Sequence, residues 1–194
     1  MIKQDIGYIL HARAYRETSQ IVDVLTQYHG RQQMVVKGIR QKKGMQSGLQ
    51  LFQCYELQFS GRSELKQLRL QEAISERVQL SQQALFCGFY INELVTRLVP
   101  VDDVSQVFEH YQDCLCQLPS QAHEPLLRAF EFHLLDDLGY SYDFTADIFS
   151  QPILPQSHYE FVFEQGFRAS ADPWAMTFSG EALQAFEQRD FSVF

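Results

Sequence analysis

The sequence predicts an α+β protein in which a strand-rich N-terminal half precedes a mainly helical C-terminal half. Near residue 80 the apolar pattern changes from short alternating runs to the three- and four-residue spacing of helices. The charge changes at the same place: residues 1–80 hold 12 Lys and Arg against 7 Asp and Glu, whereas residues 81–194 hold 4 against 17. Because 45% of the 194 residues are hydrophobic, the chain can bury one large core or two small ones. We therefore expect two domains, residues 1–80 and residues 81–194.

The first domain is expected to be a small closed barrel. Five runs rich in Ile, Val, Leu, Phe and Tyr are separated by polar turns, at residues 6–12, 20–28, 32–37, 51–59 and 65–74. The segments His29-Gly30-Arg31 and 60–63 are typical of tight hairpins. Five short strands favour a closed barrel over an open sheet, because closure removes exposed strand edges. The preferred interpretation is a five-stranded barrel of the OB type.

The second domain begins with two expected helices. Ser81 is the expected N-cap of the first and Pro100 stops it. This helix is apolar nearly all round, which predicts that neighbours bury it on every side. Asp102 or Asp103 is the expected cap of the second helix, which ends at Pro119.

Further along, a third helix should run from Pro125 to Gly139 and complete a three-helix bundle. Alternating aromatic residues at 159–163 predict a short β-hairpin, and a last helix should begin near Ser179. The chain ends on an apolar stretch, residues 191–194, so we expect this domain to be incomplete at its C-terminus.

Several kinds of chemistry are not expected. The sequence has no phosphate-binding glycine motif and none of the common hydrolase motifs. The pairs Asp102-Asp103 and Asp136-Asp137 are interpreted as helix caps or solvated acids, since neighbouring helical residues point about 100° apart. Four unevenly spaced cysteines predict neither a zinc site nor a disulfide framework, so we expect no metal and a reducing, cytoplasmic location. No signal peptide or membrane-spanning helix is expected.

The strongest functional signal is a basic segment in the first domain. Its four cations are Lys37, Arg40, Lys42 and Lys43. A glycine-containing basic loop between two barrel strands suits a backbone that follows phosphates, although a solvated loop has the same composition. Further cations of the same domain are Arg13, Arg16, Arg31, Arg62, Lys66 and Arg69. Together they predict polyanion binding without a base code.

Three aromatic residues of this domain are candidates for stacking on bases, namely Tyr8, Tyr15 and Phe52. The alternative, that they belong to the barrel core, is the more common role of aromatic residues in strands.

Eight short strings occur in order along the chain: Ile9-Leu10-His11, Arg16-Glu17-Thr18-Ser19, Gly30-Arg31, Lys37-Gly38, Leu49-Gln50-Leu51-Phe52, Tyr90-Ile91-Asn92-Glu93-Leu94, Leu127-Arg128-Ala129-Phe130-Glu131 and Leu138-Gly139-Tyr140. In this order the whole chain resembles the RecO family of bacterial recombination mediators. The resemblance implies an N-terminal OB fold followed by a helical domain.

The resemblance also implies a non-enzymatic factor in DNA repair and homologous recombination. Such proteins bind single- and double-stranded DNA and anneal strands coated with single-stranded-DNA-binding protein. They work with RecR, and often RecF, to load RecA, without a nucleotide cofactor. Family DNA contacts correspond to Lys37 and Arg40 and, by proximity, to Lys42 and Lys43. Arg16 and Arg31, two further cations of the first domain, complete the six residues that we expect to bind DNA.

A partner-binding site is implied in the second domain. There the family holds the acidic, phenylalanine-ended tail of the single-stranded-DNA-binding protein. The match at residues 127–130 assigns the terminal carboxylate to Arg128, with Leu127 and Phe130 beside it. The alternative is that Arg128 pairs with Glu124 or Glu131 on its own helix.

The chain departs from the family in two respects, and two other functions are also compatible with its sequence. The chain lacks the four-cysteine zinc site of some members, and the family usually continues for several tens of residues beyond the last helix seen here. An OB-type module for RNA or a ribosomal partner, and a nuclease using Asp102 or Asp136 with magnesium, are the alternative functions.

Overall fold

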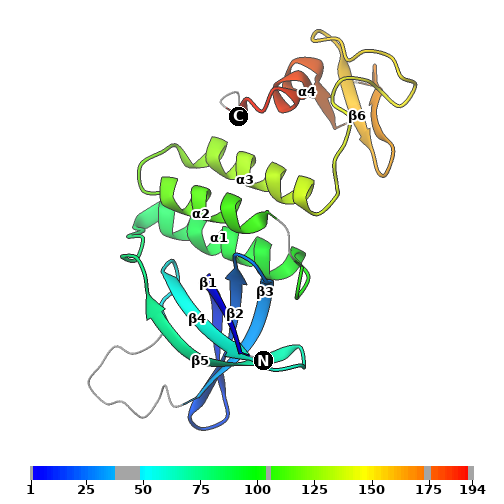
Figure 1. Cartoon of the computed structure of the whole chain (residues 1–194). Coiled ribbons are helices and arrows are strands. Elements are labelled where there is room, and N and C mark those ends of the chain that lie inside the picture. Colours follow the sequence, from blue (N-terminus) through cyan, green and yellow to red (C-terminus); the bar gives the residue numbers. More distant parts are fainter. Residues whose placement is uncertain (1, 38–48, 104–105, 173–175, 192–194) are drawn as a thin grey trace. The chain divides into compact units, whose positions relative to one another are not determined.

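The N-terminal part of the protein is a closed five-stranded barrel. A computed structural model describes residues 2–37, 49–103, 106–172 and 176–191. Its barrel strands follow the order β1-β2-β3-β5-β4, and the overall class is the predicted α+β (Figure 1). The strands are β1 (Ile2–Tyr15), β2 (Ser19–Thr26), β3 (Gly30–Lys37), β4 (Cys54–Ser60) and β5 (Leu65–Ala73). β3 and β5 pair in parallel and the other neighbours pair antiparallel, as expected of an OB-type barrel.

Alternate side chains of these strands fill the barrel. Its core consists of Ile9, Val22, Val24, Met34, Val36, Tyr55, Leu57, Phe59 and Leu68. β1 is longer than the predicted strand because it pairs with β4 along its first half and with β2 along its second. Leu51, predicted to start the fourth strand, forms only an isolated bridge with Ile9, and β4 begins at Cys54.

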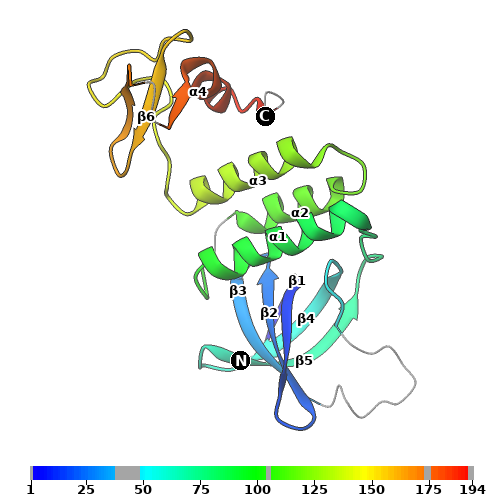
Figure 2. The same cartoon turned by 180° about the vertical axis from the view of Figure 1, so that it is seen from behind.

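Two helices pack against this barrel, α1 (Gln82–Leu98) and α2 (Val107–Gln117) (Figures 1 and 2). The ring of Phe52 lies 5.5 Å from that of Phe89 on α1. The ring of Tyr8 lies 5.7 Å from Phe108 and 5.3 Å from Tyr111, both on α2. Residues 1–123 accordingly form one compact unit.

The first helix has the predicted ends but not the predicted burial. Ser81 is its N-cap, and the helix stops at Leu98, two residues before Pro100. The expectation that α1 is buried all round is wrong, because Phe86 is 73% exposed and Phe89 and Tyr90 are also exposed. An apolar composition alone did not show which side of the helix would meet the barrel.

The predicted cap of α2 is also wrong. Its N-cap is Gln106. The carboxylate of Asp102 instead accepts a hydrogen bond from Gln32 Nε2 at 2.9 Å and lies 3.5 Å from Lys66 Nζ. The backbone N–H of Asp102 donates to the Arg31 carbonyl at 2.9 Å. Asp102 therefore fastens the segment after α1 to the β2–β3 hairpin rather than opening a helix.

Residues 124–194 form a second compact unit. Its elements are α3 (His123–Asp137), β6 (His158–Val162), β7 (Gly166–Ala169), β8 (Thr177–Ser179) and α4 (Gly180–Glu187). The predicted hairpin is confirmed as β6 and β7, and β8 joins the other edge of β6 to give a sheet that the sequence did not predict in full. Ser179 caps α4, with its side chain accepting from Ala182 N at 3.1 Å, as predicted.

The predicted boundary at residue 80 falls between β5 and α1, inside the first compact unit. The division into domains at residue 80 stays a prediction, as does the packing of three helices into one bundle. Among the described residues, no helix is both long enough and apolar enough to span a membrane.

Candidate functional site

A hollow of about 360 Å³ lies on the first unit, and we call it the barrel hollow. The lining residues that matter here are Tyr15, Arg16, Val35, Lys37, Leu65 and Gln67. They come from the ends of β1, β3 and β5 and from the β1–β2 turn. Its walls thus combine an aromatic ring, two aliphatic side chains and two exposed cations.

Strand register explains why these residues meet. Tyr15 pairs with Ser19, and Ser19 pairs with Lys37, so the β1–β2 turn with Arg16 lies beside the end of β3. The pairing of β5 with β3 extends only as far as Val35, two residues before β3 ends. The barrel hollow lies next to this point.

The structure brings together two of the six predicted DNA-binding residues. Arg16 and Lys37 both line the barrel hollow and are exposed. Arg31 lies elsewhere: its Nη1 is 3.1 Å from Asp23 Oδ1, and its side chain is only 12% exposed. The other three, Arg40, Lys42 and Lys43, lie outside the described residues.

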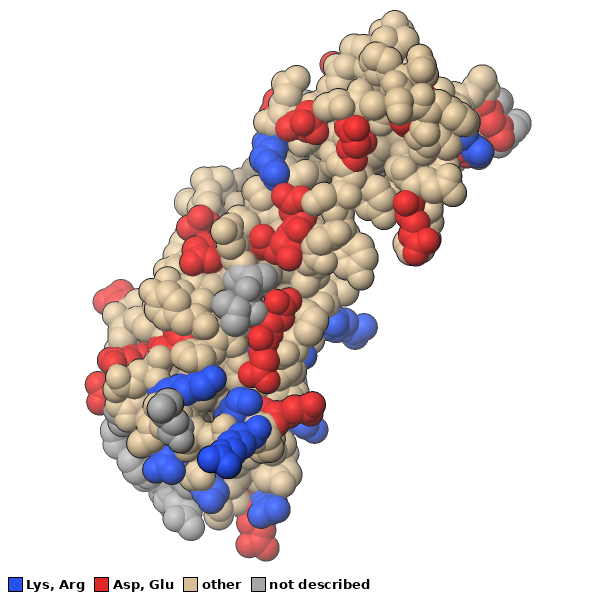
Figure 3. Space-filling model, turned by 45° about the vertical axis from the view of Figure 1, so that its right-hand side comes forward, with Lys and Arg blue, Asp and Glu red and all other residues tan. Residues whose placement is uncertain are grey.

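Other cations lie on the same unit. Lys66 is buried, with Nζ donating to the Ser63 carbonyl at 3.0 Å, so its charge is already engaged within the barrel. Arg69 is exposed and donates from Nε to Ser60 Oγ at 2.9 Å. Figure 3 shows Lys and Arg side chains gathered over the barrel on one face of the molecule.

The three aromatic candidates for base stacking differ in how far the structure exposes them. Tyr8 is 3% exposed and Phe52 1% exposed, so both are core residues. Tyr15 is half-buried in the wall of the barrel hollow, and the guanidinium carbon of Arg16 lies 5.1 Å from the centre of its ring. Tyr15 alone of the three remains available for stacking.

The second unit has a different kind of hollow, of about 240 Å³, which we call the phenylalanine hollow. Its lining includes Arg128, Phe132, Leu135, Phe161, Phe178 and Phe186, from α3, α4 and the small sheet. Carbon atoms form nearly all of this surface, and Arg128 is the one cation of its lining among the described residues.

Arg128 is placed at this hollow, while its two predicted companions are not. Its Nη1 pairs with a carboxylate oxygen of Glu131, as the alternative interpretation proposed, and its side chain remains 43% exposed. A guanidinium has five N–H donors, so this pair leaves donors for a second carboxylate. Leu127 is half-buried and Phe130 is 2% exposed, and neither lines the phenylalanine hollow.

Sequence reasoning missed the phenylalanines of this hollow. The signal was present, since 14 of the 16 Phe residues follow residue 80. Their common location depends on the packing of α3 and α4 with the sheet, which the sequence pattern did not specify.

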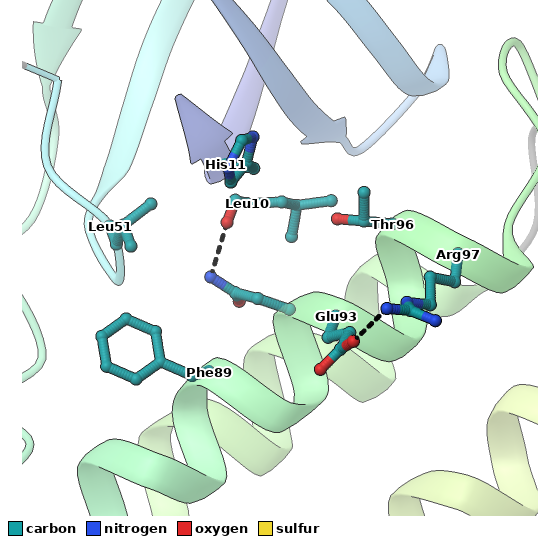
Figure 4. Close-up of a pocket in the computed structure, with 8 residues that line it drawn as sticks. Leu10, His11, Leu51, Phe89, Glu93, Thr96 and Arg97 are labelled. Carbon is teal, nitrogen blue, oxygen red and sulfur yellow. Dashed lines mark hydrogen bonds and ion pairs between the residues drawn. The ribbon is translucent and has the colours of Figure 1, made fainter. Parts of the chain in front are cut away.

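A third hollow, of about 450 Å³, lies between β1 and α1 in the first unit. Figure 4 shows Leu10, Leu51 and Phe89 around it, with the ion pair of Glu93 and Arg97 at one side. Asn92 contributes a hydrogen bond from Nδ2 to the Leu10 carbonyl at 2.9 Å. This hollow is mostly apolar; Asn92 joins the helix to the barrel, whereas the Glu93–Arg97 pair lies within α1.

The acids considered for a nuclease site are held by other partners. The hydrogen bond from Gln32 lowers the pKa of Asp102, and the hydrogen bond from Ser141 lowers the pKa of Asp136. Arg189 also pairs with Asp136 at 3.1 Å. In the part of the chain that the structure describes, no group of three or more His, Cys, Asp or Glu side chains could hold a metal ion.

Comparison with known proteins covers nearly the whole chain. The family described as Recombination protein O N terminal matches residues 1–77, and Recombination protein O C terminal matches residues 80–189. The chain is 41% identical over 190 residues to the DNA repair protein RecO of Haemophilus influenzae, covering 96% of this chain and 80% of that protein. It is 39% identical over 191 residues to the DNA repair protein RecO of Actinobacillus pleuropneumoniae, with the same coverage. On both the family matches and the identity to these relatives, the chain belongs to the RecO family.

Proposed function

We propose that this protein is a DNA repair and recombination mediator that acts by binding alone. Its barrel binds the phosphates of single- and double-stranded DNA, and its second unit holds the tail of the single-stranded-DNA-binding protein. With RecR, and often RecF, it anneals coated strands and helps to load RecA. The observation that carries this proposal is that each unit of this RecO-family chain has a hollow of its own, one with two exposed cations in the barrel and one formed mainly by phenylalanines beside Arg128.

The barrel supplies the DNA-binding half of the proposal. Arg16 and Lys37 are exposed and line the same hollow, and Arg40, Lys42 and Lys43 come shortly after Lys37 in the sequence. Cations that neutralise phosphates release condensed counterions, which makes binding favourable and dependent on salt. The excess of acids after residue 80 would repel DNA from the rest of the chain and so direct it to the barrel.

The phenylalanine hollow supplies the partner-binding half. An acidic peptide that ends in phenylalanine has an aromatic side chain and a terminal carboxylate, and the hollow offers an apolar surface beside one guanidinium. Apolar burial would hold the ring, while Arg128 could pair with the carboxylate. Only four Arg and no Lys follow residue 80, so few other cations could take this part.

For DNA binding, we expect Arg16→Gln combined with Lys37→Gln to weaken single-stranded DNA binding roughly tenfold at low salt. Each lost phosphate contact should also reduce the slope of log K against log salt by about 0.7. Fluorescence anisotropy with a labelled oligonucleotide across a salt series measures both. The matched control is Arg97→Gln, which removes an exposed cation on α1 and should change little.

Unchanged affinity and slope in the double variant would contradict DNA binding at the barrel hollow. An RNA oligonucleotide of the same sequence tests the alternative function. Clearly tighter binding of RNA than of DNA would favour an RNA-binding module.

For the partner tail, we expect Arg128→Ala to lose about 10- to 100-fold in affinity for a peptide of that tail, because a hydrogen bond to a charged group contributes about 1.5 to 3 kcal/mol. The same anisotropy measurement with a labelled peptide tests this. The control Arg168→Ala removes another exposed arginine of this unit, paired with Glu160, and should bind normally. If Arg168→Ala loses as much affinity as Arg128→Ala, net charge rather than the phenylalanine hollow governs the interaction.

A further inference from the structure

We propose that the barrel hollow takes a single unstacked nucleotide, whose base stacks on Tyr15 while its phosphate meets Arg16 and Lys37. This rests on the proposed DNA binding and adds to it a preference for single strands at this hollow. The residues concerned are all described, and all line one hollow of about 360 Å³.

The walls suit a base as well as a phosphate. Tyr15, Val35 and Leu65 are each half-buried, so each presents part of an apolar surface to the hollow. The volume lies within the range of about 300 to 1,000 Å³ that is usual for small-molecule sites. A flat base could cover this surface, and Gln67 adds an exposed amide that can hydrogen-bond to a base edge.

Tyr15 and Arg16 already lie together as a pair of planar groups on which a base can stack. The guanidinium carbon of Arg16 lies 5.1 Å from the ring centre of Tyr15, which is the distance of a cation–π contact. Both groups are planar, and bases in single strands stack on aromatic rings and on guanidinium planes alike.

The backbone at Arg16 supports a binding role for this turn. Its φ of 53° is in the left-handed region, which non-glycine residues seldom adopt. Such conformations concentrate at binding sites, where the surrounding structure holds them. Pairing of Tyr15 with Ser19 closes the turn at this point and keeps Arg16 beside its ring.

The phosphate has two available cations. Lys66 also lines the hollow, but its Nζ donates to the Ser63 carbonyl and lies 3.5 Å from Asp102. Arg16 and Lys37 are exposed and both line the hollow, Arg16 from the β1–β2 turn and Lys37 from the end of β3. A base in a duplex is already stacked and paired, so only a single strand could offer base and phosphate together.

The test compares Tyr15→Ala with Tyr15→Phe in the full chain. Tyr15→Ala removes the ring on which one base would stack, so we expect this variant to bind single-stranded DNA roughly 5- to 100-fold more weakly. Tyr15→Phe keeps the ring and should bind like the parent protein. The control Tyr28→Ala removes an exposed tyrosine from the β2–β3 turn and should have no effect.

Two further readouts separate stacking from charge. The salt slope should stay unchanged in Tyr15→Ala, because stacking releases no counterions, and binding of a fully paired duplex should change little. An abasic oligonucleotide should bind the parent protein as weakly as Tyr15→Ala binds the normal strand, which requires no variant to fold.

The outcomes also separate this inference from the function on which it rests. If the parent protein binds DNA with salt dependence but Tyr15→Ala and the abasic strand behave normally, the stacking site is wrong and the DNA-binding function stands. If neither DNA form binds the parent protein, both are wrong. Equal losses for single strands and duplexes in Tyr15→Ala would also overturn the inference.

Discussion

The substitution Gly30→Ala should lower the free energy of unfolding by about 2 to 5 kcal/mol. Gly30 has a φ of +64°, and a left-handed conformation costs a residue with a Cβ about 1 to 2 kcal/mol. A Cβ there would also lie 1.7 Å from the Asp103 carbonyl oxygen, and such overpacking costs about 1 to 3 kcal/mol more. The neighbouring Asp102 is fastened to Arg31 and Gln32, so the segment cannot move away without losing those bonds.

Denaturant unfolding of Gly30→Ala, compared with that of Gly139→Ala, separates the conformational cost from the cost of overpacking. Gly139 has a φ of +83°, but no atom lies within 4 Å of the position that its Cβ would take. Only the conformational cost, about 1 to 2 kcal/mol, is expected there. Similar losses at both glycines would mean that the hairpin and the segment after α1 are not held in contact.

The substitution Asn92→Leu should lower the free energy of unfolding by about 2 to 6 kcal/mol although the two side chains are similar in size. Asn92 is 4% exposed. Its Nδ2 donates to the Leu10 carbonyl at 2.9 Å, the bond drawn beside the hollow in Figure 4, and its Oδ1 accepts from the Tyr111 hydroxyl at 2.6 Å. Leucine would leave that carbonyl and that hydroxyl buried without a partner, at about 1 to 3 kcal/mol each.

A double-mutant cycle with Tyr111→Phe tests this explanation by denaturant unfolding. Burial raises the pKa of Tyr111 well above its ordinary value, so its hydroxyl stays protonated and serves as a donor. In the double variant the hydroxyl is absent, so its loss should be smaller than the sum of the two single losses. Strict additivity would show that Asn92 and Tyr111 do not act through their hydrogen bond.

The barrel could be predicted because its signals are local. The turn residues at 29–31 and 60–63 and the alternating apolar residues predict strands without knowledge of their neighbours. The burial of α1 and the position of Asp102 could not be predicted, since both depend on contacts with residues far away in the sequence. Asp102 contacts Gln32 and Lys66, and the sequence around Asp102 contains no pattern that predicts these contacts.

The same distinction between local signals and contacts far apart in the sequence applies to the candidate sites. Arg16, Lys37 and Arg128 could be selected from charge and from the family resemblance, and the structure places each at a hollow. The hollows themselves could not be predicted. The barrel hollow lies where the parallel pairing of β3 with β5 ends, and the phenylalanine hollow needs α3, α4 and the small sheet together.

The division of the chain at residue 123 places the barrel hollow and the phenylalanine hollow in separate compact units of one polypeptide. Under the proposed function, a ligand that carries both DNA and an acidic tail would meet both sites of the same chain. Once one site is occupied, the other would face its target at a raised effective concentration, and avidity can exceed either affinity by about 10²- to 10⁴-fold. Two individually weak contacts would thus suffice to select coated DNA over bare DNA or free partner, and either contact could still exchange rapidly.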